Sequence, residues 1–328
     1  MSVKVRQPYF DSLKFFAMFL VIWGHCVERC VSRPCTEEPM WHFIYTFHMP
    51  LFMIISGYFS LSTIFNNGGW KYLIVKKSKT LLLPVLSWTV IFILVQPWFG
   101  LSNFNFLNTL WFLRCLFLCY LLHFAGSKLH FKGWQVLTIL ISQAVPVSFY
   151  NVPIMYPCFV LGAFLREWPA LFTSICKHWW AFMSVFLVLM YFTDYHLWLG
   201  ISLKETIVSH DWNAFSLYGF GRLYRIFTGV MGAFAFIGLF KRLHEAGTKG
   251  WLVRKIRIMG QYTLEMYILQ TLFTGLVLRA WVHLDDMNLW TFNFVVTPVL
   301  SVLIVVASMA VVWLVRRSRW LSLLLFGR

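Results

Sequence analysis

The sequence predicts an all-α protein that is embedded in a membrane as a bundle of about ten helices. Of its 328 residues, 59% are hydrophobic and only 12% are charged, roughly half the charged fraction of a soluble domain. Long apolar runs recur along the whole chain, and apolar segments that cross a bilayer form helices. Because no stretch between them is long enough for a soluble domain, we predict one membrane-embedded domain over residues 1–328.

Ten segments are predicted to be transmembrane helices. Each is apolar over much of the roughly 20 residues that a helix needs to cross a bilayer. They lie at residues 10–30, 41–63, 80–99, 108–126, 133–149, 152–166, 178–199, 222–241, 259–282 and 290–315.

The basic residues indicate which loops face the cytoplasm. The formal net charge is +16, and twenty of the 28 Lys and Arg residues fall in alternate loops or near the two ends of the chain. They are Lys4, Arg6, Lys71, Lys76, Lys77, Lys79, Lys128, Lys132, Arg166, Lys177, Lys241, Arg242, Lys249, Arg254, Lys255, Arg257, Arg316, Arg317, Arg319 and Arg328. By the positive-inside rule, both termini are cytoplasmic and the protein is integral to the cell (inner or plasma) membrane. The charge is therefore a topological signal that also attracts membrane lipid head groups, and we predict no nucleic-acid binding.

The first apolar segment argues against a cleaved signal peptide, and the cysteines argue against a metal site. Asp11 and Lys14 interrupt the start of that segment and no small-residue cleavage site follows, so we expect a retained helix rather than a cleaved signal. The seven cysteines show no zinc-like spacing, and we predict no metal site. Cys30 and Cys35 fall in the first outer loop, where they either pair or stay as free thiols.

Lys14 and His25 are the most informative polar residues of the first helix. Eleven residues are close to three helical turns, which places both on one face, roughly 16 Å apart along the axis. Ionisable groups inside a membrane helix mark a functional interior by default. Two structural alternatives are open. In one, Lys14 extends to the cytoplasmic interface and pairs with Asp11. In the other, His25 only forms a hydrogen bond with a neighbouring helix.

The predicted topology sorts the other intramembrane polar residues by depth. An outer cluster contains His25, His48 and Arg114, with Arg222 and Arg225 near the same level as interface anchors or members of the cluster. An inner cluster contains Asp11, Lys14 and Glu265. An Arg a full turn inside a span needs a buried partner or a ligand, so Arg114 is the hardest of these to explain structurally.

Five motifs, in order along the chain, give the sequence a resemblance to the membrane-bound acyltransferase-3 family. The first motif combines the spacing of a basic residue and a histidine, Lys14 and His25, with the helix-two sequence Phe47-His48-Met49-Pro50. The others are Lys76-Lys77-Ser78-Lys79 before the third helix, Leu110-Trp111-Phe112-Leu113, Phe159–Arg166 with Gly162, and Gly260–Gln270 with Glu265 and Tyr267. Ten spans with both ends inside is also the architecture of that family.

The resemblance implies transfer of an acyl group, usually acetyl from cytoplasmic acetyl-CoA, to a hydroxyl of an envelope glycan or a lipid-linked sugar. Two positions depart from the family pattern. Lys14 stands where the family usually has Arg, which keeps the charge but loses the bidentate fork. Gln270 stands where a His is common, so the candidate bases are His25 and His48.

The residues allow a direct mechanism. An imidazole exchanges protons near neutral pH, and we expect His25 to be the general base that deprotonates the acceptor hydroxyl for attack on the thioester. Arg114 or His48 would stabilise the oxyanion or hold the acceptor. Lys14, Lys76, Lys77 and Lys79 are the expected contacts of the donor phosphates. No nucleophile elbow is present, which leaves Cys26 as the thiol to consider for an acyl-enzyme.

The competing interpretation is a transporter or flippase, because intramembrane His, Arg and Glu residues often move protons or solutes. No inverted repeat and no matching pair of Gly/Pro-broken helices supports it. The acceptor, the acyl chain length and the oligomeric state are not readable from the sequence. We expect the outer loops at 28–41, 100–107 and 200–221 to shape acceptor choice, with His210, Asp211 and Trp212 as sugar contacts or interface anchors.

Overall fold

The computed structural model describes residues 7–60, 69–100, 110–129, 131–145, 151–193, 212–247 and 250–328, with only the backbone described for 212–218. Every regular element in these residues is a helix, and they contain no strand. The predicted all-α class is therefore confirmed.

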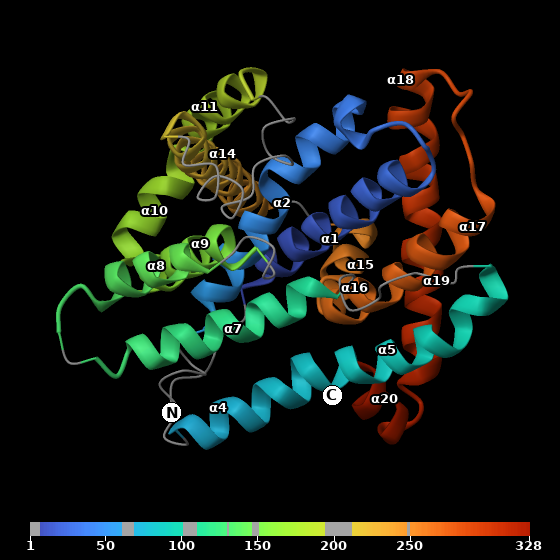
Figure 1. Ribbon diagram of the computed structural model, residues 1–328, viewed down its shortest axis with the longest axis horizontal. Coiled ribbons are helices and arrows are strands. Elements are labelled where there is room, and N and C mark those ends of the chain that lie inside the picture. The colour runs from blue at the N-terminus through green and yellow to red at the C-terminus, as the bar shows by residue number, and fades with distance from the viewer. Residues whose placement is uncertain are drawn as a thin grey trace.

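The helices follow one another along the whole described chain (Figure 1). The first half contains α1 (Pro8–Arg29), η1 (Cys35–Glu37), α2 (Pro39–Tyr58), α4 (Gly69–Lys77), η2 (Ser78–Leu82), α5 (Leu83–Val95), η3 (Gln96–Phe99), α7 (Trp111–Gly126), α8 (Trp134–Ala144) and α9 (Val152–Glu167). The second half contains α10 (Pro169–Lys177), α11 (Trp179–Tyr191), α14 (Trp212–Glu245), α15 (Trp251–Met259), α16 (Thr263–Leu272), η4 (Phe273–Leu278), α17 (Arg279–Trp281), α18 (Leu289–Thr291), η5 (Phe292–Val296), α19 (Thr297–Val315) and α20 (Arg319–Phe326).

Each of the ten predicted transmembrane segments contains a helix. In the described part of the chain, four helices are long and apolar enough to cross a membrane: Pro8–Arg29, Gly69–Phe99, Gly219–Glu245 and Leu289–Val315. A fifth crossing is possible if Val152–Glu167 and Pro169–Lys177, which meet at a bend of 107°, form one broken span. The ten-span topology and the cytoplasmic termini remain predictions.

Helices α1 and α2 lie in the middle of the bundle (Figure 1), where each packs on several other helices. Helix α2 packs on α9 and α14, whereas α1 packs on α14, α15, α16 and α19. Both central helices begin with a proline, Pro8 and Pro39. Proline suits the first turn of a helix because a backbone N–H at that position would have no hydrogen-bond partner within the helix. The residues predicted to carry chemistry on the first two helices therefore lie at the centre of the molecule.

Two glycines bring α2 and α9 into backbone contact. A Cβ added to Gly57 would lie 1.9 Å from the carbonyl oxygen of Phe159, and one added to Gly162 would lie 2.0 Å from that of Ile54. Small residues that allow such close approach are typical of helix pairs in membranes. The contact explains why a glycine is present in each of these two predicted helices.

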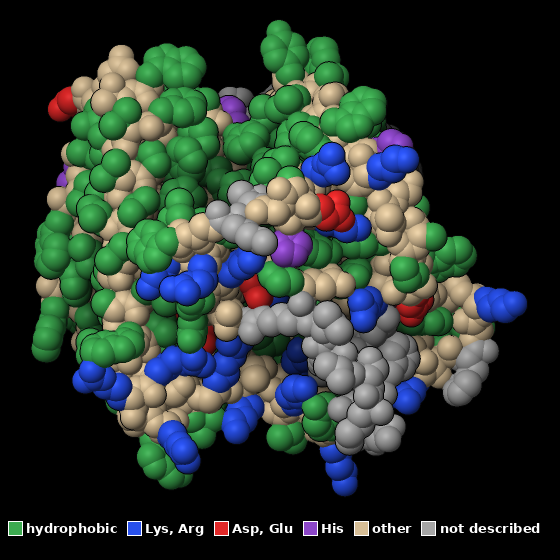
Figure 2. All heavy atoms as spheres, turned by 180° about the vertical axis from the view of Figure 1, so that it is seen from behind, with side chains coloured by type: hydrophobic (Ala, Val, Ile, Leu, Met, Phe, Trp, Pro, Cys, Tyr) green, Lys and Arg blue, Asp and Glu red, His purple; other side chains and the backbone are tan. Residues whose placement is uncertain are grey.

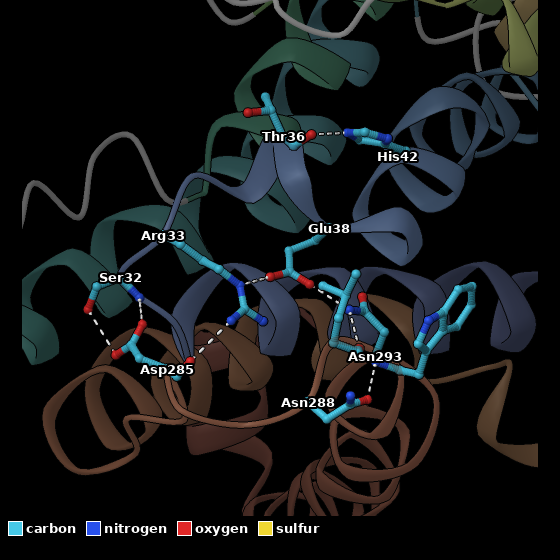
Figure 3. A network of polar contacts seen from close by, with 10 residues as sticks. Ser32, Arg33, Thr36, Glu38, His42, Asp285, Asn288 and Asn293 are labelled. Atoms are coloured by element: carbon cyan, nitrogen blue, oxygen red, sulfur yellow. Dashed lines mark hydrogen bonds and ion pairs between the residues drawn. The ribbon is translucent and has the colours of Figure 1, made fainter.

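A polar network ties the loop after α1 to the segment before α19 (Figure 3). Glu38 is fully buried; Arg33 Nε donates to its Oε1, and Asn293 Nδ2 donates to its Oε2 at 2.5 Å. The Ser32 backbone N–H donates to Asp285 Oδ1 at 2.6 Å, and Arg33 also donates to the Asp285 carbonyl. The hydrogen bond from the Ser32 N–H lowers the pKa of the Asp285 carboxyl. The network holds the end of α1 in place, next to the candidate site.

Candidate active site

Lys14 and His25 lie on one uninterrupted helix, α1 (Pro8–Arg29), and each lines a cavity of its own. The cavity at Lys14, here the Lys14 cavity, has a volume of about 300 Å³. The cavity at His25, here the His25 cavity, has a volume of about 390 Å³. With a rise of 1.5 Å per residue, eleven residues still separate the two side chains by roughly 16 Å along the helix.

The Lys14 cavity is cationic. Among the described residues that line it, the charged ones are Lys14, Lys76, Lys77 and Arg328, and none is acidic. Aromatic rings hold the lysine ammonium groups: Lys14 Nζ lies 4.8 Å from the centre of the Phe59 ring, and Lys77 Nζ lies 3.5 Å from that of Tyr120. Cations that face a cavity without carboxylates favour an anionic ligand.

Lys and Arg side chains also gather on the surface. Figure 2 shows that most of them on that face lie in its lower half, whereas hydrophobic side chains cover much of the remainder. Lys79 was predicted as a fourth lysine of the donor site, but its exposed side chain is not among the described residues that line the Lys14 cavity. The carbonyl of Lys79 packs against Gly327, next to Arg328.

The His25 cavity holds a cluster around the imidazole of His25. Nδ1 of His25 lies 3.2 Å from Glu28 Oε2 and 3.3 Å from the hydroxyl of Tyr45. The Tyr45 hydroxyl donates to the same Glu28 oxygen at 2.7 Å, and Arg29 pairs with the other oxygen at 3.1 Å. A carboxylate only accepts hydrogen bonds, so Nδ1 of His25 carries the hydrogen and Nε2 is left as the proton acceptor.

His48 lines the same cavity and has a similar tautomer. Its Nδ1 donates to the carbonyl of Ile44 at 2.6 Å, which again leaves Nε2 as an acceptor. The ring is buried and meets Tyr45 edge-on, with the ring centres 5.0 Å apart. Arg225 of α14 is the cationic residue in the described lining. The structure thus brings His25, His48 and Arg225 together, from three helices.

The two cavities share three wall residues. Val21 of α1, Met49 of α2 and Tyr267 of α16 line both cavities, and all three are buried. Val21 lies seven residues beyond Lys14 and four before His25 on α1, so the shared wall is closer to His25 than to Lys14. We call these three side chains, which belong to the walls of both cavities, the constriction.

Arg114 is not among the described residues that line either cavity. It is half-buried on α7, directly after Phe112 and Leu113, which line the Lys14 cavity. Glu265, predicted in the inner cluster, is fully buried and pairs with Arg328 at 3.3 Å and Arg316 at 3.8 Å.

The cysteines near the site are buried or partly buried thiols. Cys26 is fully buried and accepts a hydrogen bond from the Ser301 hydroxyl at 3.5 Å; it is absent from the described lining of the His25 cavity. Cys30 and Cys35 are both free. Cys35 lines the His25 cavity, where burial, aided by the charge of Glu28, raises its thiol pKa and disfavours a reactive thiolate.

Comparison with known proteins identifies the family. The model of the acyltransferase domain named Acyl_transf_3 matches residues 7–317. The chain belongs to the acyltransferase-3 family. This confirms the resemblance that the sequence motifs predicted, and the protein is therefore a membrane acyltransferase.

Two relatives of this acyltransferase are each named nodulation protein NolL. The one from Mesorhizobium japonicum is 26% identical over 353 residues, which cover 98% of this chain and 90% of the relative. The one from Sinorhizobium fredii is 30% identical over 176 residues, which cover 48% of each chain. No solved structure gives a significant match.

Sequence reasoning did not single out Glu28 or Tyr45 as part of this acyltransferase site. Glu28 carried a usable signal, because a carboxylate three residues after a histidine lies on the same helix face. Tyr45 carried none, because its contact with His25 depends on how α2 packs against α1.

Some predicted contributors lie outside the described residues. They are 101–107 and 200–211 of the outer loops, with His210 and Asp211, and the basic residues Lys4, Arg6 and Lys249. The side chain of Trp212 is likewise not described. Within the described part of the acyltransferase, no three His, Cys, Asp or Glu side chains form a group that could hold a metal ion.

Proposed function

We propose that this acyltransferase moves an acetyl group from acetyl-CoA to a hydroxyl of an envelope glycan or a lipid-linked sugar, with His25 as the general base. The observation that carries the proposal is the pair of cavities along α1. One is cationic and the other holds a histidine with an acceptor nitrogen, and three of the described wall residues line both.

The Lys14 cavity fits the donor. Acetyl-CoA carries several phosphate charges at one end and the thioester at the end of a long, flexible arm. Lys14, Lys76 and Lys77 would bind the phosphates as point charges. The roughly 16 Å from Lys14 to His25 is about the length that an extended arm covers. Binding of the phosphates at Lys14 therefore directs the thioester toward the constriction.

The reaction then proceeds at the constriction, close to His25. Nε2 of His25 takes the proton of the acceptor hydroxyl while the acceptor oxygen forms a bond to the thioester carbonyl carbon. Glu28 and Tyr45 hold the ring, and the carboxylate of Glu28 stabilises the imidazolium that results. The tetrahedral intermediate collapses with cleavage of the carbon–sulfur bond, and the CoA sulfur receives the proton from His25.

Cationic groups stand near the place where negative charge develops. Arg225 lines the His25 cavity, and Arg114 follows Phe112 and Leu113, which line the Lys14 cavity. Positive charge at a developing oxyanion lowers the barrier because the interaction is stronger in the transition state than in the ground state. Neutral His48 has no hydrogen on Nε2, so it would accept a hydrogen bond from the acceptor rather than stabilise the oxyanion.

The lining of the His25 cavity is compatible with a sugar. Trp41 and Trp111 supply flat apolar surfaces, while Asn151 and His48 supply hydrogen-bonding groups. A sugar ring has apolar faces and polar edges, and binding sites combine apolar walls with a few placed polar groups in the same way.

The test is acetyl transfer by purified protein in lipid nanodiscs, with radiolabelled acetyl-CoA and an envelope extract as acceptor. His25→Ala is expected to lose about 10²-fold or more of the transfer rate, the typical contribution of a general base, and to keep its affinity for CoA. His178→Ala, an exposed histidine, is the matched control. Wild-type transfer by His25→Ala would exclude His25 as the base. Counter-ion-dependent solute uptake without acyl-CoA would instead support a transporter.

A further inference from the structure

The segment that follows the family match carries a side chain into the Lys14 cavity. The match ends at residue 317, and α20 (Arg319–Phe326) lies beyond it. Arg328, two residues after this helix, lines the cavity together with Lys14, Lys76 and Lys77. The cationic wall of the cavity is therefore built partly from residues outside the family domain.

The segment is fixed against η2 and α5, which continue the helix that carries Lys76 and Lys77. The indole N–H of Trp88 on α5 donates to the carbonyl of Leu325 at 2.9 Å, and Phe326 is fully buried. Gly327 has φ +69°, a left-handed conformation, and a Cβ there would lie 2.2 Å from the carbonyl oxygen of Lys79. Both the conformation and the close approach require glycine. The path of the chain just before Arg328 is thus defined by contacts with η2 and α5.

A buried carboxylate holds the guanidinium of Arg328. One terminal nitrogen lies 3.3 Å from Oε1 of Glu265 and 3.4 Å from the carbonyl of Gln261. The side chain of Glu265 is completely buried, with 0% of its surface accessible. The side chain of Arg328, in contrast, is 44% accessible. Guanidinium has five N–H donors, and the contacts described for Arg328 use one nitrogen. The others remain able to bind a ligand.

We propose that Arg328 is a donor-binding residue, which binds a phosphate of acyl-CoA from a position set by Glu265 and Gly327. The identity of the ligand rests on the proposed function, whereas the cationic site itself rests on the geometry of the cavity. Arg328 supplies the planar, multidentate phosphate donor that Lys14 cannot supply. A lysine at position 14 is therefore accompanied by an arginine from a different part of the chain.

The test measures binding of free CoA to the full-length protein in nanodiscs by calorimetry. Arg328→Gln is expected to weaken CoA binding about 10-fold at low salt, in line with loss of a charge-assisted hydrogen bond. The difference should shrink as salt is raised, because the exposed part of the interaction is screened. Arg328→Lys should restore part of the affinity. Arg319→Gln, an exposed arginine of the same segment that is absent from the described lining, should bind CoA as the wild type does.

A second variant separates folding from binding. Gly327→Ala keeps Arg328 but displaces it, so CoA affinity should fall with little change in the far-UV circular dichroism spectrum. If Arg328→Gln and Gly327→Ala bind CoA normally while Lys14→Ala does not, the role of Arg328 is refuted and the proposed function stands. If the wild type itself fails to bind CoA, both the role of Arg328 and the acyl-CoA donor are refuted.

Discussion

Glu28 and His25 lie one helical turn apart on α1, and Oε2 of Glu28 is 3.2 Å from Nδ1 of His25. The same carboxylate oxygen accepts a hydrogen bond from Tyr45 at 2.7 Å. The pair fixes the ring so that Nε2 is the free nitrogen, which is the condition for a general base. The proposed chemistry of His25 therefore depends on Glu28 as a positioning residue.

Replacing Glu28 by Gln should slow transfer without abolishing it. The amide keeps the shape of the carboxylate but loses its charge, so the imidazolium formed during the reaction is less stable. Hydrogen bonds to charged groups contribute about 1.5–3 kcal/mol, which corresponds to a decrease in kcat of about 10- to 10²-fold. The steady-state rate and the KM for acetyl-CoA are measured, and KM should change little because Glu28 does not line the Lys14 cavity as described.

Glu37→Gln is the matched control for this variant, since Glu37 is exposed and lies outside the described lining of both cavities. Its rate should equal that of the wild type. The role of Glu28 would be disproved if Glu28→Gln kept the wild-type kcat and pH profile. A pH profile is included because a purely structural role would lower the rate without moving the profile.

The sequence was informative where spacing along one helix determines position. Lys14 and His25 were predicted to share a face and to lie at different depths, and the structure places them at two cavities along one helix. The all-α class followed from composition alone. The number of spans stays a prediction, because several predicted segments contain described helices shorter than a bilayer requires, such as Trp134–Ala144.

The contacts between helices could not be predicted. Tyr45, Val21 and Met49 are ordinary apolar or aromatic residues in the sequence, and their roles depend on the packing of α1 against α2. Arg328 lies far in the sequence from Lys14 and reaches its cavity only because α20 packs against α5. Lys79 has the right charge and spacing, but its side chain is exposed. Tertiary packing, rather than local pattern, decides each of these cases.

Gly24 should be essential for the position of Tyr45. A Cβ at Gly24 would lie 2.7 Å from Cε2 of the Tyr45 ring, so Gly24→Ala must move the ring away from α1. The hydrogen bond from Tyr45 to Glu28 would then lengthen, and we expect kcat to fall by about as much as in Tyr45→Phe, roughly 10-fold for a lost hydrogen bond to a charged group. Gly221→Ala, where nothing lies within 4 Å of the added Cβ, should retain full activity. Equal rates for the two alanine variants would contradict the prediction.

Met49 should limit the length of the acyl group. It belongs to the constriction that lines both cavities, and a longer acyl chain at this point would have to enter the His25 cavity or displace the wall. Met49→Ala is expected to raise kcat/KM for butyryl-CoA relative to acetyl-CoA by about 10-fold, since one or two methylenes in an apolar pocket change binding by about 1–3 kcal/mol. The ratio is measured by competition between the two donors in nanodiscs.

The control is Met53→Ala, one turn further along α2, where the methionine is fully buried but absent from the described lining of either cavity. It removes the same atoms from the same helix and should destabilise the protein without changing the donor ratio. A donor ratio that shifts equally in both variants would show that general loosening of the bundle, rather than the constriction, controls chain length.

Glu38 should contribute more to stability than its exposed neighbour Glu37. Glu38 is fully buried between Arg33 and Asn293, so Glu38→Ala leaves a guanidinium and an amide without their carboxylate partner (Figure 3). Loss of one partner of a buried ion pair costs about 3–5 kcal/mol; because Arg33 is partly exposed, we expect the lower end, about 3 kcal/mol. The unfolding temperature in nanodiscs should fall by several degrees, while Glu37→Ala leaves it unchanged. Similar unfolding temperatures for the two variants would mean that the network does not stabilise the C-terminal end of α1.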